Sequence, residues 1–255
     1  MLPLDDPNLP WLGTLVGVPL LGFSFWCTNQ FIVQRVLGAR IIAHARWGAL
    51  FAGLLKLSVL YIMVLPGLMA VILLPDLENP DLVFPTLVST LLPAGLSGLV
   101  FAGLLAALMS SIDSTLNSAS ALLTMDFMRP AQRGWSARKT TWVGRGCIVL
   151  FMLIAAMVSP LIEHFPGLFH YLQSALAYLV PPVAIIFLFG LFWPRASANG
   201  AFITLLGGHA FSAGLFLLSS LDLLSLHFTI VAGLLGLVSA IIMLVVSLLT
   251  EAPSR

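Results

Sequence analysis

Seven long apolar segments, separated by short polar breaks, set the pattern of this 255-residue chain. Each is near or above the ~20 residues that a helix needs to span a bilayer. They cover residues 11–37, 47–73, 93–126, 140–159, 168–192, 199–219 and 227–249. We therefore expect an all-α, polytopic membrane protein with about seven transmembrane helices, in a single transmembrane domain over residues 1–255.

The composition points the same way. Hydrophobic residues make up 60% of the chain and charged residues 8%, and the mean hydropathy is +1.07, which excludes an ordinary soluble enzyme. The two cysteines lie in apolar segments and the five histidines show no metal-ligand spacing, so we expect neither a disulfide framework nor a metal site of that kind. The basic residues are scattered through short breaks, so nucleic acid is not an expected partner.

The breaks between the segments alternate in the sign of their charge. One set carries Arg35, Arg40, Arg46, Arg129, Arg133, Arg138, Lys139, Arg145, Arg195 and Arg255. The other set carries Asp5, Asp6, Asp76, Glu78, Asp81, Glu163 and Asp222, with no Lys or Arg. The positive-inside rule predicts that the first set is cytoplasmic. We expect an integral protein of the plasma or inner membrane, with its N-terminus outside, its C-terminus inside and no cleavable leader.

Hydroxyl groups, one amide and two carboxylates, Asp113 and the terminal Asp126, interrupt the third segment over residues 104–126. Its small and hydroxyl side chains recur every three or four residues and so share one helix face, with Asp113 on the flank. They are Ala107, Ser110, Ser111, Ser114 and Ser118. Such residues also allow close helix packing, and serine can bond to its own helix. The adjacent pair Ser110 and Ser111 beside an intramembrane acid favours a sodium site, since sodium prefers oxygen ligands.

Two opposite charges lie inside predicted spans. Lys56 is about three turns from the cytoplasmic end of the second span, which is too deep for comfortable snorkelling. Asp113 lies in the third span. Two interpretations of Lys56 remain open: it pairs with Asp113 or with a carbonyl at a helix C-terminus, or it contacts a solute. If the two side chains do not pair, Asp113 serves a cation.

The first span combines helix breakers with the polar cluster FSFWCTNQ, residues 23–30. Transporters use discontinuous helices to hold ions and polar solutes, whereas a kink whose backbone groups are satisfied by neighbouring helices is the alternative. The breakers are Gly13, Gly17, Pro19 and Gly22. Trp26 suits stacking on a sugar or a place in an interfacial aromatic belt.

The fifth span has a polar entry ahead of Pro181 and Pro182. Gln173 lies in this entry, about one turn inside the membrane. A buried amide needs hydrogen-bond partners, and either a neighbouring helix or a ligand supplies them.

Four segments resemble the C-terminal part of a sodium/solute symporter, in the sodium/glucose cotransporter branch. They are FWCTNQFIVQRVLGA (25–39), FAGLLKL (51–57), FPTLVSTLLPAGLSGLVFAGLLAALMSSIDSTLNSASALLTMD (84–126) and YLQSALAYLVPPVAIIFLFGLFWPRASANGAF (171–202). The resemblance implies a core of two inverted repeats with peripheral helices, working by alternating access. This chain matches only the second repeat and the later helices.

The resemblance also assigns site residues. It implies that Ala107, through its carbonyl, and Ser110 and Ser111 line a sodium site. It places Phe25 and Trp26 at the inner gate. It also implies that Lys56 and Gln173 lie in or near a sugar pocket.

Three features depart from the family pattern. Phe25 stands where the gate residue is typically tyrosine, so a hydroxyl contact is lost. Asp113 replaces an uncharged residue, which implies a second cation, proton coupling or a partner for Lys56. The first repeat has no counterpart in the chain, so we expect a fragment, an internally initiated product or one half of a split transporter, with a missing N-terminal half as partner.

The sequence therefore predicts sodium-coupled symport of a sugar or similar small polar solute, incomplete in this chain alone. We expect no enzymatic activity, and no cofactor beyond the coupling sodium ion. Symport of an inositol, amino acid or carboxylate is the alternative within the same superfamily. A non-transporting membrane scaffold is the alternative from another class.

Overall fold

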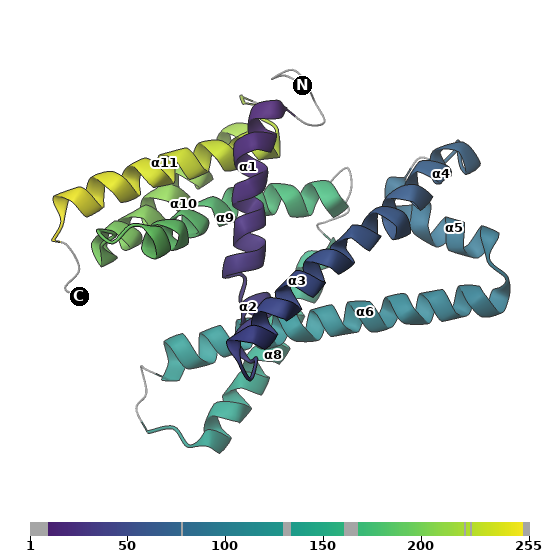
Figure 1. Ribbon diagram of the computed structural model, residues 1–255, viewed down its shortest axis with the longest axis horizontal. Helices are drawn as coiled ribbons and strands as arrows, with labels where there is room; N and C mark the ends of the chain where they lie inside the picture. Colours follow the sequence, from purple (N-terminus) through teal and green to yellow (C-terminus); the bar gives the residue numbers. More distant parts are fainter. Residues whose placement is uncertain are drawn as a thin grey trace. The chain divides into compact units, whose positions relative to one another are not determined.

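The computed structural model of the chain describes residues 10–77, 79–129, 134–160, 168–221, 223–224 and 226–251. Within these ranges the regular secondary structure is entirely helical (Figure 1). Seven helical segments in them are long and apolar enough to cross a membrane: Trp11–Thr28, Ile42–Leu73, Ala94–Met128, Ala137–Val158, Leu168–Phe192, Ala198–Ser220 and Phe228–Leu249. The predicted all-α class and the seven spans are confirmed. The first span ends at Thr28 rather than at residue 37.

The chain divides into two compact units, which are described one at a time. Unit 1 comprises Met1–Val33 and Phe169–Arg255, and unit 2 comprises Gln34–Leu168. The boundary falls within a short helix, α2 (Gln30–Leu37).

Unit 1 is a bundle of four long helices. They are α1 (Trp11–Phe23), which continues as the π-helical turn η1 (Ser24–Thr28), α9 (Leu168–Phe192), α10 (Ala198–Ser220) and α11 (Phe228–Leu249). Helix α11 packs against both α1 and α10. One apolar cluster of the core joins Leu20 of α1 to Ile185 and Met243, and a second joins Leu215 to Val231 and Leu235.

Two glycines bring α1 close to α11. Gly13 and Gly17 lie four residues apart and so face the same side of α1. A Cβ atom on Gly13 would overlap the Thr229 side chain, and one on Gly17 would overlap the Thr229 carbonyl oxygen. These glycines therefore serve close helix packing. Helix α1 continues through them and through Pro19, so the predicted helix break does not occur there.

Two prolines inside α9 leave carbonyl groups without their usual backbone donors. Pro182 has no N–H to offer the carbonyl of Tyr178, four residues earlier. The Ser212 hydroxyl of α10 donates to this oxygen at 2.6 Å. The ring nitrogen Nε2 of His209 lies 3.2 Å from the next carbonyl oxygen, that of Leu179. The neighbouring helix thus supplies a donor to the carbonyl that Pro182 leaves without one.

Polar groups fasten the start of α10 to the end of α11. The backbone N–H of Ser197 donates to the Ser247 hydroxyl at 3.2 Å, and the Ser197 side chain accepts from the N–H of Gly200 at 3.0 Å. Arg195 donates to the carbonyl of Leu248 at 3.1 Å. A cation at this position also complements the negative end of the α11 dipole.

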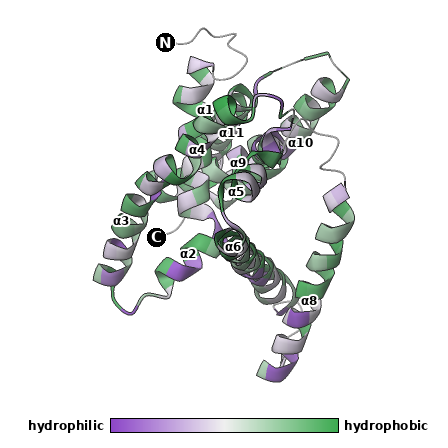
Figure 2. Ribbon diagram, turned by 90° about the vertical axis from the view of Figure 1, so that its right-hand side faces the viewer, coloured by the Kyte–Doolittle hydropathy of each residue, from purple (hydrophilic) through white to green (hydrophobic). Residues whose placement is uncertain are grey.

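Unit 2 contains the second to fourth spans. Its long helical segments are α3 (Ile42–Val59), η2 (Leu60–Val64) and α4 (Leu65–Leu73) in one path, α6 (Ala94–Ala121) continued by η4 (Leu122–Met128), and α8 (Ala137–Val158). The shorter η3 (Pro80–Leu82) and α5 (Val83–Leu91) connect α4 to α6. Figure 2 shows that hydrophilic residues concentrate in α2 and at the start of α8, whereas most of the other helical surface is apolar.

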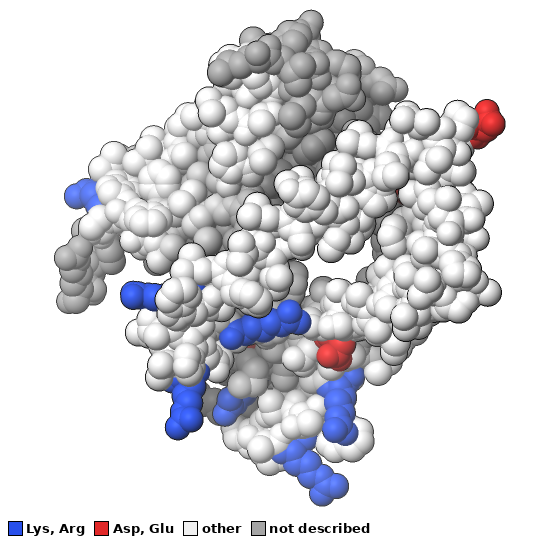
Figure 3. All heavy atoms as spheres, turned by 45° about the vertical axis from the view of Figure 1, so that its right-hand side comes forward, with Lys and Arg blue, Asp and Glu red and all other residues white. Residues whose placement is uncertain are grey.

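The two basic segments of unit 2 lie at the same end of its long helices. These are the α2–α3 connection with Arg40 together with the start of α3 with Arg46, and the start of α8 with Arg138 and Lys139 (Figure 1). Most Lys and Arg side chains visible in Figure 3 gather in the lower part of that view. Asp76 and Asp81, which lie between α4 and α5, are at the other end of Ile42–Leu73. Several residues used for the predicted orientation lie outside the described residues: Asp5, Asp6, Glu78, Arg133, Glu163, Asp222 and Arg255.

Candidate functional site

The hydroxyl-rich face of α6 forms a ladder of hydrogen bonds to its own backbone. The Ser111 hydroxyl donates to the carbonyl of Ala107 at 3.0 Å, and Ser114 donates to the carbonyl of Ser110 at 2.8 Å. Ser118 continues the ladder by donating to the Ser114 carbonyl at 2.7 Å. Each hydroxyl proton is thereby directed into the helix, and the oxygen lone pairs remain available to an outside donor or cation.

Helix α2 covers the C-terminal part of this face. The Gln34 side-chain amide donates to the Ser118 hydroxyl oxygen at 2.8 Å, and the Arg35 guanidinium donates to that of Ser114. Adjacent residues of α2 thus contact two serines that are one turn apart on α6. For Ser114 and Ser118 the structure favours the helix-packing interpretation, in which their oxygens accept from a neighbouring helix.

The predicted sodium residues lie one to two turns farther toward the N-terminal end of α6. Ala107, Ser110 and Ser111 are all exposed. The carbonyl of Ala107 and the hydroxyl of Ser111 are brought together by their hydrogen bond. Their oxygens form a compact, uncharged set on one surface of unit 2, and their role as sodium ligands stays a prediction.

Asp113 on α6 and Lys56 on α3 both belong to unit 2, and both are exposed. The ion pair between them and the alternative cation role of Asp113 stay predictions.

The predicted gate lies at a real discontinuity of the first span. Phe25 and Trp26 are in η1, and the backbone turns extended at Asn29, with φ −72° and ψ 118°, before α2 begins. Phe25 packs edge-on against Trp26, with 5.5 Å between ring centroids, and against Phe31 at 6.0 Å. The side chains of Phe25 and Trp26 are 40% and 45% exposed, respectively. Both rings therefore present surface to a ligand or to another part of the protein.

Gln173 lies in the second turn of α9 and is half-buried. It belongs to unit 1, as do Phe25 and Trp26, whereas Lys56 belongs to unit 2. A solute pocket that unites these residues stays a prediction.

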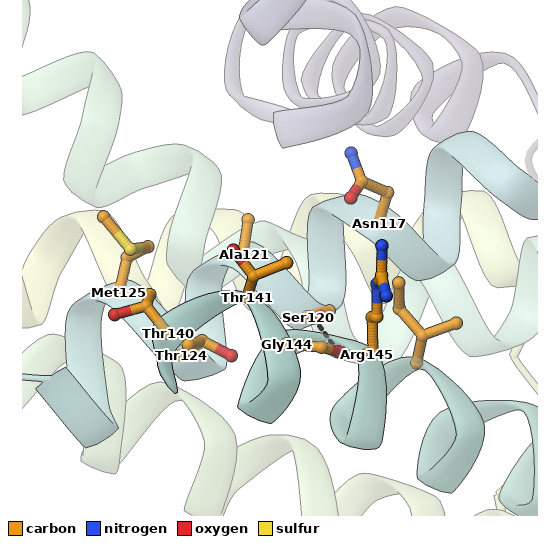
Figure 4. Close-up of a pocket in the computed structure, with 10 residues that line it drawn as sticks. Asn117, Ser120, Ala121, Thr124, Met125, Thr140, Thr141, Gly144 and Arg145 are labelled. Atoms are coloured by element: carbon orange, nitrogen blue, oxygen red, sulfur yellow. Dashed lines mark hydrogen bonds between the residues drawn. The ribbon is translucent and has the colours of Figure 1, made fainter. Parts of the chain in front are cut away.

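Sequence reasoning missed a pocket of 330 Å³ between α6, η4 and α8 (Figure 4). Ser120 is buried beneath it and donates to the carbonyl of Gly144 at 2.7 Å. The sequence signal that could have indicated this pocket is a pair of polar helix faces. One lies near the end of the third span and the other near the start of the fourth. Their polar pocket-lining residues are Asn117, Ser120, Thr124, Thr140, Thr141 and Arg145.

These features define an all-α integral membrane protein with a broken first span and an oxygen-lined face on a long helix. The sequence profile of the Sodium:solute symporter family matches residues 4–208, and the chain belongs to this family. The predicted resemblance is confirmed.

The relatives that the chain matches are named as cotransporters. Sodium/myo-inositol cotransporter 2 of Homo sapiens is 41% identical over 220 residues, which cover 79% of this chain and 33% of that protein. The protein of the same name from Oryctolagus cuniculus is 37% identical over 284 residues, covering 97% and 42%. Sodium/myo-inositol cotransporter of Mus musculus is 34% identical over 283 residues, covering 98% and 39%. The chain thus spans about a third to two-fifths of the length of these relatives.

Proposed function

We propose that this chain provides the sodium-binding helix and part of the solute path of a sodium-coupled symporter. The observation that carries the proposal is the exposed oxygen set of Ala107, Ser110 and Ser111 on α6, in a chain that belongs to the Sodium:solute symporter family. The proposed solute is myo-inositol or another small hydroxylated ring, because the similar proteins are named sodium/myo-inositol cotransporters. The proposed function is transport rather than catalysis, with sodium as the coupling ion.

The chemistry of the sodium site follows from the ladder. Because the Ser111 hydroxyl donates its proton to the Ala107 carbonyl, the Ser111 hydroxyl oxygen keeps its lone pairs for a cation. Neutral oxygens attract sodium without creating a deep charge trap, so the ion can leave again during the cycle. Sodium drives transport by binding the outward-open state more tightly than the inward-open state.

The solute is proposed to bind near the break of the first span. The ring of Trp26 offers an apolar face to the carbons of a cyclic polyol, and the Gln173 amide offers both a donor and an acceptor to its hydroxyls. Phe25 contributes packing alone, because it lacks a hydroxyl. The extended residue Asn29 gives the gate a point at which the backbone can turn.

We further propose that the basic end of unit 2 faces the cytoplasm, with the N-terminus of the chain outside and the C-terminus inside. Arg40, Arg46 and the start of α8 lie at that end, and Asp76 and Asp81 lie at the other. This separation fits the positive-inside rule.

A chimera tests the sodium site. The chain replaces its aligned segment in the Oryctolagus cuniculus cotransporter, and uptake of labelled myo-inositol is measured against sodium concentration. The variant Ser110→Ala/Ser111→Ala is expected to need about tenfold more sodium for half-maximal uptake, the effect of losing ~1.4 kcal/mol of ligand contacts. The control Ser58→Ala removes an exposed hydroxyl that also bonds its own helix, at 2.6 Å to Leu55. An unchanged sodium dependence in a well-expressed double variant would contradict the assignment.

A further inference from the structure

The pocket between α6, η4 and α8 is built separately from the proposed sodium face. Asn117 is the pocket residue nearest that face along α6, and it lies six residues beyond Ser111. The floor is fixed, because Ser120 is 2% exposed and bonded to the carbonyl of Gly144. A Cβ atom on Gly144 would lie 3.5 Å from the Ser120 hydroxyl oxygen, which is an ordinary van der Waals contact.

The pocket offers hydrogen-bond donors on one side. Figure 4 shows the side chains of Asn117 and Arg145 extending to the same side of the pocket. Neither side chain has a hydrogen-bond partner among the residues that the structure describes. By contrast, the hydroxyls of Thr140 and Thr141 already donate to backbone carbonyls at 3.2 and 3.0 Å. The unused donors are therefore a guanidinium and an amide, which suit a ligand rich in acceptor oxygens.

The charge around the pocket suits an anion. Helix α8 begins at Ala137 and has no acidic residue in its first turn, which carries Arg138 and Lys139. The Ser136 side chain caps this end by accepting from the N–H of Lys139 at 3.3 Å, but no carboxylate in the first turn offsets the positive end of the helix dipole. Asp113 and Asp126 are the carboxylates nearest to the pocket residues along α6 and η4, and neither lines the pocket.

The position of Arg145 along α8 places its guanidinium near the headgroup layer of the membrane. Arg145 lies roughly 12 Å along α8 from its start, and its guanidinium lies over the Trp142 ring, 5.1 Å from the centroid. Trp142 is 61% exposed, as expected of a tryptophan at a membrane interface. A charge inside a span needs a partner, and a lipid phosphate is the anion available at that level.

We infer that this pocket binds the phosphate headgroup of an anionic phospholipid. The planar guanidinium of Arg145 pairs with two phosphate oxygens, and the Asn117 amide donates to a third acceptor of the headgroup. The apolar part of the lining, Ala121, Met125 and Ile148, receives the glycerol and the first acyl carbons. A soluble phosphate would leave that apolar part unused. With the orientation proposed above, the lipid comes from the cytoplasmic leaflet.

The test uses the purified full chain in phosphatidylcholine nanodiscs that contain a small share of phosphatidylglycerol with a photoreactive acyl chain. Crosslinked lipid is located by mass spectrometry, and we expect it on α6, η4 and α8 around the pocket. Arg145→Gln is expected to lower this labelling about tenfold, as the loss of a charge-assisted phosphate contact would. Arg138→Gln removes the same charge from the same helix outside the pocket, and should lower the labelling no more than about twofold.

The second variant Asn117→Leu keeps every charge and is expected to weaken labelling without changing thermal unfolding. It tests the pocket even if Arg145→Gln fails to fold. Equal labelling of the Arg145 and Arg138 variants, or no labelling of the pocket in the unmodified chain, would overturn the inference. Inorganic phosphate added to lipid-free detergent micelles is expected to leave thermal unfolding unchanged; stabilisation that Arg145→Gln abolishes, without lipid labelling, would instead identify a soluble anion. The readouts involve no transport, so they are independent of the proposed sodium site.

Discussion

Ser212 of α10 donates its hydroxyl to the carbonyl oxygen of Tyr178 at 2.6 Å, and Pro182 is the reason that this oxygen lacks a backbone donor. In a membrane no water replaces the missing donor, so the partner must come from the protein. The bond therefore allows α9 to carry its prolines and still pack against α10.

Replacing Ser212 with alanine should destabilise unit 1 by about 1 kcal/mol, because a half-buried carbonyl loses its partner. Thermal unfolding of the purified chain in detergent measures the loss. Ser220→Ala is the matched control on the same helix, since the Ser220 hydroxyl is exposed and donates to the carbonyl of Leu217 in its own helix. Equal melting temperatures for the two variants would show that Ser212 has no special role.

Glycines of α1 should respond oppositely to substitution according to their surroundings. Gly17→Leu forces α1 away from α11, because even a Cβ atom would overlap the Thr229 carbonyl, and we expect a loss of about 1–3 kcal/mol or more. At Gly22 no atom lies within 4 Å of the position that a Cβ atom would take, so Gly22→Ala should be neutral or stabilise by up to about 1 kcal/mol. A Gly17→Leu variant with unchanged thermal stability would show that α1 and α11 do not pack closely.

The roles of Lys56 and Asp113 can be separated by a double-mutant cycle in the chimera. If they form an ion pair, removing one charge leaves the other unpaired in the membrane, so each single neutralisation should be worse than the double one. Surface expression and sodium-dependent uptake of Lys56→Met, Asp113→Asn and the combined variant are compared. Simple addition of two mild effects would exclude the pair and favour a cation at Asp113.

The 255-residue polypeptide, expressed by itself, should insert into membranes but not accumulate solute. A midplane site between inverted repeats needs groups from both, and alternating access needs one bundle to move against another. Uptake of labelled myo-inositol and of glucose into proteoliposomes that contain only this chain is the measurement. Sodium-dependent accumulation there would contradict the expectation and would point to a site built by more than one copy.

The spans were predictable from sequence because a membrane helix is defined by a long apolar run, which hydropathy detects directly. The role of Gly13 and Gly17 in packing α1 against α11 was not predictable from sequence. Glycine occurs both where helices break and where they pack closely, and only the four-residue spacing of this pair hinted at packing. The break itself falls at Asn29, within the predicted polar cluster, where the backbone turns extended.

The hydroxyl face of α6 was predictable as a face, because its residues repeat at helical spacing. That spacing did not predict that one part of the face contacts α2 while the other part stays exposed. Ser114 and Ser118 accept from Arg35 and Gln34, which lie about 80 residues away in the sequence, and no local pattern encodes such a pairing. The pocket at Arg145 was missed for the same reason, since its two walls come from different helices.

The two hydrogen bonds from α2 to α6 connect α6 to the break in the first span. Gln34 holds Ser118 at 2.8 Å, and α2 runs back without interruption to Asn29, where the first span is broken. If α6 moves as the proposed transport function requires, these hydrogen bonds would move α2 with it, and the backbone would bend at Asn29. Phe25 and Trp26 of η1 lie on the other side of Asn29, so the covalent chain itself would couple the proposed gate to α6.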